Sequence, residues 1–201
     1  MKSIFSVAVF FLTIFAATIN TANAQTIGLI PRKIIFGNPD KSSVMLSHDG
    51  KHISYLAPKN GVMNIWVAPV GELSKATSIT NDNLRGIRYY GWAYDNEHIL
   101  YAKDEKGDEN WRIYSYSIST KKTKLLTPAS GTVAFVYGSS PKFPEEMLIG
   151  QNDRDKRFFD IYRYNIVDGS KKLVFKNDRF TGFTTDSNLN IRFAQLTNNQ
   201  G

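Results

Sequence analysis

An isoleucine followed by an aromatic residue recurs at a fixed step of 48 residues along this chain. The three pairs are Ile65-Trp66, Ile113-Tyr114 and Ile161-Tyr162. Each pair leads into an alternating run typical of a strand, and shorter apolar runs stand about 14 residues before it and shortly after it. A period of 40–50 residues that contains several short strands is the sequence signature of a β-propeller blade. The repeat therefore predicts a chain built from propeller blades.

Each unit divides into four short strands, and Asp, Asn and Gly gather at the joints, where they favour turns. Helical periodicity is poor everywhere after residue 24, because β-branched and aromatic residues dominate. The predicted fold is all-β, an incomplete propeller of about three and a half four-stranded blades. A lead-in segment at 25–40 precedes the blades, which are expected at about 41–80, 84–127, 131–176 and, for the half blade, 179–196, followed by a tail at 197–201.

The first 24 residues have the layout of a secretory signal peptide. Lys2 gives a positive start, Ile4 to Ala17 is almost wholly apolar, and cleavage is predicted between Ala24 and Gln25. An uncleaved membrane anchor is the rival interpretation, but about 14 apolar residues fall short of the roughly 20 that a spanning helix needs. The sequence therefore predicts a periplasmic or secreted protein that meets the membrane only through its signal peptide. The absence of cysteine excludes disulfides and thiolate metal sites.

The net charge of +7 does not predict a nucleic-acid surface. The basic residues are scattered over predicted turns, such as Lys121-Lys122 and Lys171-Lys172. A surface for nucleic acid would concentrate them on one element or place stacking aromatics among them. Solvated hairpin tips explain the charge, and no nucleic-acid partner is expected.

The residues of a catalytic centre are missing from the sequence. A nucleophile elbow needs Gly-x-Ser-x-Gly, and no such pentapeptide occurs. The three histidines, His48, His52 and His98, stand in a turn or at the start of strands, where a structural role is expected. Neighbouring carboxylates lack the spacing of an EF-hand, and no glycine-rich phosphate loop is present. We expect no metal, no cofactor and no catalysis by this chain alone.

Two charged hairpins form a candidate interaction face. The segments 58–63, 104–110 and 152–158 each join the second strand of a unit to the third, so they are expected at one end of the propeller. Ordinary solvated loop tips are the alternative explanation of their charge. The residues of the candidate interaction face are Asp108, Glu109, Asn110, Asp153, Arg154, Asp155 and Arg157.

Residues 30–196 resemble the N-terminal propeller of bacterial prolyl oligopeptidase-family serine peptidases, the group of dipeptidyl aminopeptidases and acylaminoacyl peptidases. The turn of that family usually reads Ser-Pro-Asp-Gly-Lys, and here His48 replaces the proline. Such turns are shared with TolB-like and WD-like propellers, so the opening Phe36-Gly37-Asn38-Pro39 is more specific. The other matching motifs are Gly107-Asp108-Glu109-Asn110 and Asp153-Arg154-Asp155-Lys156-Arg157-Phe158-Phe159-Asp160.

The resemblance implies a propeller that filters short peptides for a C-terminal α/β-hydrolase domain with a Ser-Asp-His triad. Since that domain and further blades are absent from this sequence, the first hypothesis is a non-catalytic propeller fragment of an exported peptidase. A complementing chain would then carry the remaining blades and the hydrolase domain, and peptides would bind only in that full-length context. The second hypothesis is a stand-alone periplasmic TolB-like module for protein binding or scaffolding.

Overall fold

The computed structural model describes residues 29–128 and 130–197 of the chain. The described residues fall into two units, one that ends at Gly37 and one that begins at Asn38. The predicted signal peptide and its cleavage site between Ala24 and Gln25 lie outside the described residues, as do residues 198–201 of the tail. Among the residues that are described, no helix has the length and apolar character needed to cross a bilayer.

The first unit contains a short α-helix, α2 (Arg32–Phe36), although the sequence predicted no helix after residue 24. Pro31 precedes its first turn with a φ of −57°, and the backbone N–H of Ile34 donates to the Pro31 carbonyl at 2.8 Å. Proline fixes a φ that suits a helix start. A helix of five residues is also too short to show a period of 3.6, so the apolar pattern could not reveal it.

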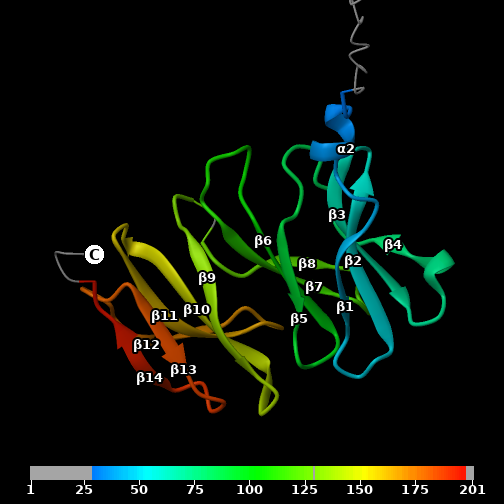
Figure 1. The fold of residues 1–201 in the computed structure, drawn as a ribbon. Helices are drawn as coiled ribbons and strands as arrows, with labels where there is room; N and C mark the ends of the chain where they lie inside the picture. Colours follow the sequence, from blue (N-terminus) through cyan, green and yellow to red (C-terminus); the bar gives the residue numbers. More distant parts are fainter. Residues whose placement is uncertain (1–28, 129, 198–201) are drawn as a thin grey trace, which may run out of the picture. The chain divides into compact units, whose positions relative to one another are not determined.

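The second unit is made of antiparallel sheets in which neighbouring strands follow one another in sequence, and Figure 1 shows them side by side from cyan to red. In the described part of this unit, three sheets have four strands and the fourth has two, so an all-β, incomplete propeller is confirmed. The first sheet holds β1 (Ser42–Leu46), β2 (His52–Lys59), β3 (Val62–Pro69) and β4 (Thr77–Ser78), with the 3₁₀ turn η1 (Leu73–Lys75) before β4. The second holds β5 (Tyr89–Trp92), β6 (His98–Lys103), β7 (Arg112–Ser117) and β8 (Thr123–Leu125); the third holds β9 (Ala134–Ser140), β10 (Phe143–Asp155), β11 (Phe158–Asn165) and β12 (Lys171–Phe175); the fourth holds β13 (Gly182–Thr185) and β14 (Ile191–Gln195).

The repeated isoleucine connects each sheet to the next one. Ile65, Ile113 and Ile161 lie in the third strands and are at most 4% exposed. Ile65 packs in the cluster between the first and second sheets, Ile113 in the next cluster and Ile161 in the last. Because successive side chains of a strand point to opposite faces, the aromatic neighbour faces backward. Tyr114 accordingly packs in the same cluster as Ile65, and Tyr162 in the same cluster as Ile113.

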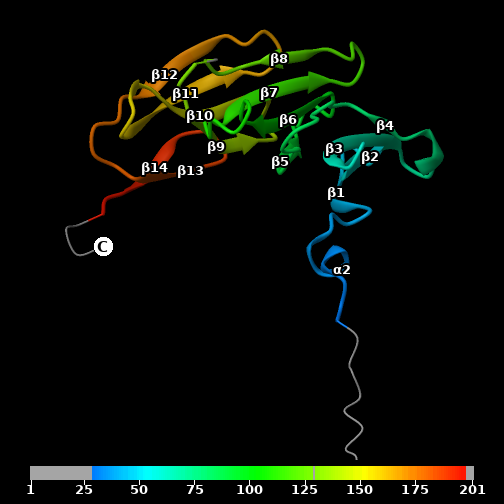
Figure 2. The same cartoon turned by 90° about the horizontal axis from the view of Figure 1, so that it is seen from above.

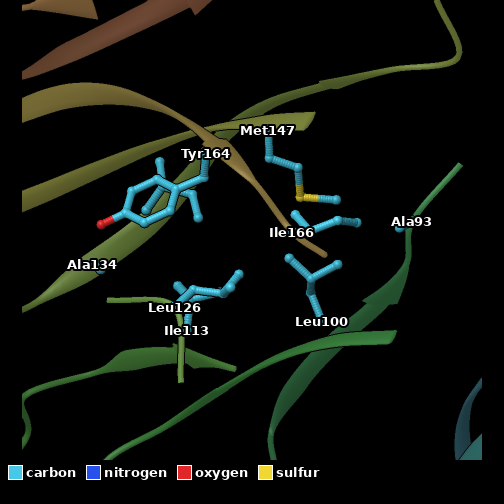
Figure 3. Packing of buried hydrophobic residues seen from close by; sticks show 9 residues of the cluster. Ala93, Leu100, Ile113, Leu126, Ala134, Met147, Tyr164 and Ile166 are labelled. Carbon is cyan, nitrogen blue, oxygen red and sulfur yellow. The ribbon is translucent and has the colours of Figure 1, made fainter. Parts of the chain in front are cut away.

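The largest buried cluster lies between the second and third sheets. Figure 3 shows its side chains meeting from strands of both sheets. Strands that are covered on both faces read as continuous apolar runs, which explains the apolar run from Ile99 to Ala102 within β6. The cluster consists of Ala93, Leu100, Ile113, Leu126, Ala134, Met147, Ile149, Tyr164 and Ile166.

The first strand of every sheet lies along the same side of the row of sheets. Figure 2 shows β1, β5, β9 and β13 on this side and β4, β8 and β12 on the other. In a propeller the first strands surround the central channel. The side formed by β1, β5, β9 and β13 is therefore called the inner side below.

The third sheet has an irregular stretch just after its first turn. That turn is confined to Pro141 and Lys142, and β10 begins at Phe143. The register between β9 and β10 shifts between Phe143 and Met147. Pro144 lies in this irregular stretch, and proline is tolerated at a bulge because it has no N–H for the ladder. The bulge accommodates the proline without ending the strand.

His48, which stands where the turn of the resembling family usually has proline, contacts a residue of the second sheet. The His48 ring stacks on Tyr94 with centroids 4.1 Å apart and planes at 17°. The backbone N–H of the following Asp49 donates to the Asn96 side chain at 2.8 Å. The turn of the first sheet therefore contacts the equivalent turn of the second sheet, which is a contact between blades that a proline ring would not make through π stacking.

Candidate interaction surface

The three segments predicted to share one end do connect the second and third strands of their sheets. The first is a tight turn in which Asn60 and Gly61 have φ values of 53° and 82°. Two positive φ values are what a two-residue hairpin requires. The second segment is a true loop between β6 and β7. In the third, β10 continues to Asp155, so only Lys156 and Arg157 form the turn, and the expected loop at 152–158 is shorter than predicted.

Most charges of the candidate interaction face have partners within the same hairpin. The Asp108 carboxylate accepts hydrogen bonds from the backbone N–H of Glu105 at 3.0 Å and from the Arg112 guanidinium at 2.7 Å. Slight burial raises the pKa of Asp108, but these bonds lower it well below its usual range. Arg157 donates to Asp155 at 2.8 and 3.1 Å, and this exposed pair lowers the pKa of the Asp155 carboxyl.

Arg154 binds Asp160 rather than a free surface partner. Its Nε and one terminal nitrogen each lie 2.7 Å from an Asp160 oxygen, and the guanidinium also donates to the Asn177 carbonyl. The hydrogen bond to Asp160 raises the pKa of Arg154. Burial raises the pKa of Asp160, but the hydrogen bonds from Arg154 and the Asn177 amide and the charges of Arg154 and Lys176 together lower it by more, so the net shift is downward. Bidentate contacts of this kind fix both side chains.

The remaining members of the candidate interaction face lie on two separate hairpins. Glu109 and Asp153 are exposed, and Asp153 lies 3.9 Å from Lys171. Asn110 donates to Asp108 at 3.2 Å. Within the described residues, no hydrogen bond or ion pair joins the 108–110 group to the 153–157 group, so the seven residues form two rigid charged tips.

The structure reveals three buried polar residues that the sequence interpretation missed. Asn64, Arg112 and Asp160 are at most 4% exposed. Each stands directly before the repeated isoleucine, so all three share the 48-residue step. The signal was present in the sequence, but three different residue types at one repeat position do not look like a motif.

Two of these residues hold the segment that leads into the next sheet. Asn64 accepts a hydrogen bond from the Asp82 amide at 2.7 Å and donates to the Asp82 carbonyl at 2.9 Å. Asp160 accepts from the Asn177 amide at 2.7 Å. Since buried polar groups are retained when they are hydrogen-bonded, these residues fix the exit of one blade to the entry of the next.

Asp82 is the charged centre of the junction between the first two sheets. Its carboxylate accepts the backbone N–H groups of Leu84, Arg85 and Gly86 and pairs with Lys103 at 2.9 Å. Burial raises the pKa of Asp82, but the Gly86 and Leu84 amides and the Lys103 ammonium outweigh it and lower the value to about 2. The junction is thus held by an ionised carboxylate at neutral pH.

The histidines have structural surroundings. His98 Nδ1 lies 2.6 Å from Asp95, whose other oxygen accepts the amides of Glu97 and His98. His52 stacks against Trp92 with centroids 6.0 Å apart. The described residues contain no group of three His, Cys, Asp or Glu side chains arranged to hold a metal ion.

A cavity of about 640 Å³ opens between the second and third sheets near the inner side. Its walls come from β5, β6, β9, β10 and the Trp111 segment, and they are mostly aromatic or aliphatic. The Ala134 amide donates to the Trp111 carbonyl at 2.8 Å, which joins the two walls. The cavity therefore lies next to Asn110, a member of the candidate interaction face.

Over residues 29–128 and 130–197, three antiparallel four-stranded sheets and a two-stranded fourth share a common inner side, so the fold belongs to the class of partial β-propellers. No family model matches the sequence. Dipeptidyl aminopeptidase BIII from Pseudoxanthomonas mexicana is 40% identical over 174 residues, which cover 86% of this chain and 25% of that protein. Dipeptidyl peptidase family member 6 from Caenorhabditis elegans is 34% identical over 177 residues, covering 85% and 24%. The chain thus spans about a quarter of the length of these relatives.

Among solved structures, the β-propeller domain of the Trilobed protease from Pyrococcus furiosus has a TM-score of 0.52 at 18% identity. The match covers 73% of this chain and 46% of that one, and it supports the fold alone. The sequence relatives carry the family relationship. The expected resemblance to the propeller of prolyl oligopeptidase-family peptidases is therefore confirmed.

Proposed function

We propose that this chain provides the propeller segment of an exported serine peptidase of the dipeptidyl aminopeptidase kind. The observation that carries the proposal is the 40% identity to dipeptidyl aminopeptidase BIII over 86% of the chain. The propeller sheets support it, because the matched length corresponds to the blades and not to isolated motifs. In this role the segment controls which peptides reach a hydrolase domain, and short peptides are the substrates.

The catalytic groups of this proposal lie outside residues 1–201. The sequence has no Gly-x-Ser-x-Gly elbow, and without a nucleophile and its base only binding effects remain. The hydrolase domain is then carried by further residues or by a complementing chain. The two rigid charged tips at 108–110 and 153–157 are the surface we assign to contact with that domain.

Peptidase assays with and without the downstream polypeptide test this proposal. The chain alone is incubated with chromogenic dipeptides and an active-site serine probe, and neither turnover nor labelling is expected. The DNA directly downstream of this coding sequence should encode further blades and a Gly-x-Ser-x-Gly elbow, and adding that polypeptide should give turnover and serine labelling. Labelling of this chain itself would refute its non-catalytic role, and an unrelated downstream sequence would favour a stand-alone binding module.

We also propose export to the periplasm or beyond, with Gln25 as the new N-terminus. The proposal is supported by the positive start, apolar core and small-residue cleavage site in the sequence. N-terminal sequencing of the protein recovered from an exporting bacterial host is the measurement. An intact Met1 on protein that remains in the cytosol would contradict export.

A further inference from the structure

The cavity between the second and third sheets exists because one strand position has no side chain. In β5, Gly91 pairs with Leu100, and Tyr89 pairs with Ala102. Directly opposed residues of antiparallel strands share a face. Leu100 packs against the third sheet, so Gly91 faces that sheet as well. A Cβ placed at Gly91 would have no neighbouring atom within 4 Å.

The backbone of Gly91 does not require glycine. Its φ is outside the positive range, and it lies within a regular ladder from Tyr89 to Trp92. Glycine in a strand weakens the sheet, and it often marks a place where a ligand approaches closely. The missing side chain therefore leaves room that no backbone constraint explains.

Aromatic side chains line one wall of this room. Tyr89 and Trp111 form an edge-to-face pair with centroids 6.4 Å apart, and Val136 lies on the opposite wall. Tyr89 is 69% exposed and Val136 is 46% exposed, so both side chains have free surface at the cavity. Rings arranged in this way offer faces and edges to a further ring. The volume of about 640 Å³ is in the range of small-molecule sites, roughly 300–1,000 Å³.

Arg88 gives the cavity a single positive charge. It is the one charged residue among those lining the cavity, and its guanidinium lies 5.9 Å from the centroid of the Trp111 ring. Within the described part of the chain, no carboxylate lies within 4.0 Å of Arg88, so its charge is not neutralised by an ion pair there. A guanidinium binds a carboxylate through two parallel hydrogen bonds.

We propose that this cavity binds an aromatic ring that carries a carboxylate. The ring enters the space beside Gly91 between Tyr89 and Val136, and the carboxylate binds Arg88. A free aromatic amino acid and the C-terminal aromatic residue of a short peptide share this chemistry. The site belongs to the propeller itself, so it requires no catalytic domain and is independent of the proposed peptidase role.

Binding measurements on the full chain, by saturation-transfer NMR and titration, test the proposal. N-acetylphenylalanine should bind with a Kd on the order of 1 mM, as suits about 15 non-hydrogen atoms. N-acetylphenylalaninamide lacks the carboxylate and N-acetylalanine lacks the ring, so both should bind at least about tenfold more weakly. Free phenylalanine and the dipeptide Ala-Phe distinguish the two sources, since tighter binding of one identifies it.

Two variants test the geometry of the site. Arg88→Gln should weaken N-acetylphenylalanine about tenfold and leave the amide unchanged. Arg179→Gln is the matched control, because Arg179 is also exposed and lies 4.7 Å from the Phe180 ring on another part of the unit. Gly91→Leu should abolish ring binding by filling the space. Equal binding of acid and amide, or unchanged binding by Arg88→Gln, would overturn the proposal even if Gly91→Leu failed to fold.

Discussion

The two faces of β5 differ sharply, although they belong to one strand of four residues. Toward the first sheet, β5 presents Tyr90 and Trp92, and Trp92 is only 7% exposed. The Trp92 indole donates to the Ser54 hydroxyl at 2.8 Å, and the Tyr90 hydroxyl lies 3.2 Å from the same oxygen. Toward the third sheet, β5 presents Tyr89 and Gly91, which leave a cavity.

The difference shows that blades of one propeller need not pack equally well. The first interface is closed by large side chains whose polar atoms are hydrogen-bonded, which gives both stability and a fixed geometry. The second interface is closed only away from the inner side, by the cluster that contains Leu100 and Met147. The second interface has room for a bound molecule, whereas the first holds its two sheets rigidly together.

The largest expected effect on stability comes from removing the Trp92 indole at the interface between the first and second sheets. Trp92→Ala removes a buried ring and a hydrogen bond, so the free energy of unfolding should fall by about 3–5 kcal/mol. Trp111→Ala, at the half-exposed rim of the cavity, should cost only about 1 kcal/mol. Urea denaturation followed by circular dichroism measures both. Equal losses would show that the two interfaces are energetically alike.

Acid should act on the junction of the first two sheets. Asp82 has a pKa lowered from 3.8 to about 2 in the folded protein, so its contribution is fully present above about pH 4 and is lost as pH falls through 2. The contribution is about 2 kcal/mol. At the next junction the Val133 amide donates to the neutral Asn152 side chain, which does not titrate.

The measurement is the free energy of unfolding from pH 5 to pH 2 for the natural chain and for Asp82→Asn. The natural chain should lose more stability over this range than the variant, since other carboxylates titrate equally in both. Parallel curves for the two proteins would assign the acid sensitivity to other groups.

Ser54→Ala tests the hydrogen bond between the Trp92 indole and the Ser54 hydroxyl at the interface of the first and second sheets. The change leaves the buried Trp92 N–H without its acceptor, and the free energy of unfolding should fall by about 1–2 kcal/mol. Ser139→Ala, at the exposed rim of the cavity, should stay within about 0.5 kcal/mol. Thermal unfolding of both variants measures the two changes in stability. If Ser54→Ala left the free energy of unfolding unchanged, water or another group would have replaced the hydroxyl.

The smallest effect has the opposite sign. Gly91→Val adds a β-branched side chain in open space, and it should raise the free energy of unfolding by about 1 kcal/mol. The same denaturation experiment measures it. A destabilised variant with normal secondary structure would show that the cavity is closed in solution.

The sequence predicted the blades well because the repeat reports burial. The isoleucine and its aromatic neighbour must alternate between two covered faces, so their pattern survives in every unit and locates β3, β7 and β11. The helix α2 escaped because five residues show no period. The expectation of an open charged face was less informative, since Asp108, Arg154 and Asp155 are bound by residues only a few positions away.

The cavity could not have been predicted from the sequence. Gly91 lies within the blade expected at 84–127, and a glycine in a strand there has several structural explanations. Only the register, which pairs Gly91 with Leu100, assigns it to the face toward the third sheet. Long-range register depends on the packing of neighbouring strands, and this information is not contained in a local pattern.

The forward isoleucine and the backward aromatic residue also give the row of sheets a direction. A sheet presents Ile65, Ile113 or Ile161 to its successor and receives Tyr114 or Tyr162 from it. Such a contact is heterologous, so the two outer faces of the row differ from each other. A two-fold dimer through one outer face would place two identical faces against each other, so the complementary contact between the isoleucine face and the aromatic face would not form. Association through these faces must instead proceed head to tail, which leads to a closed ring or to an open chain of rows.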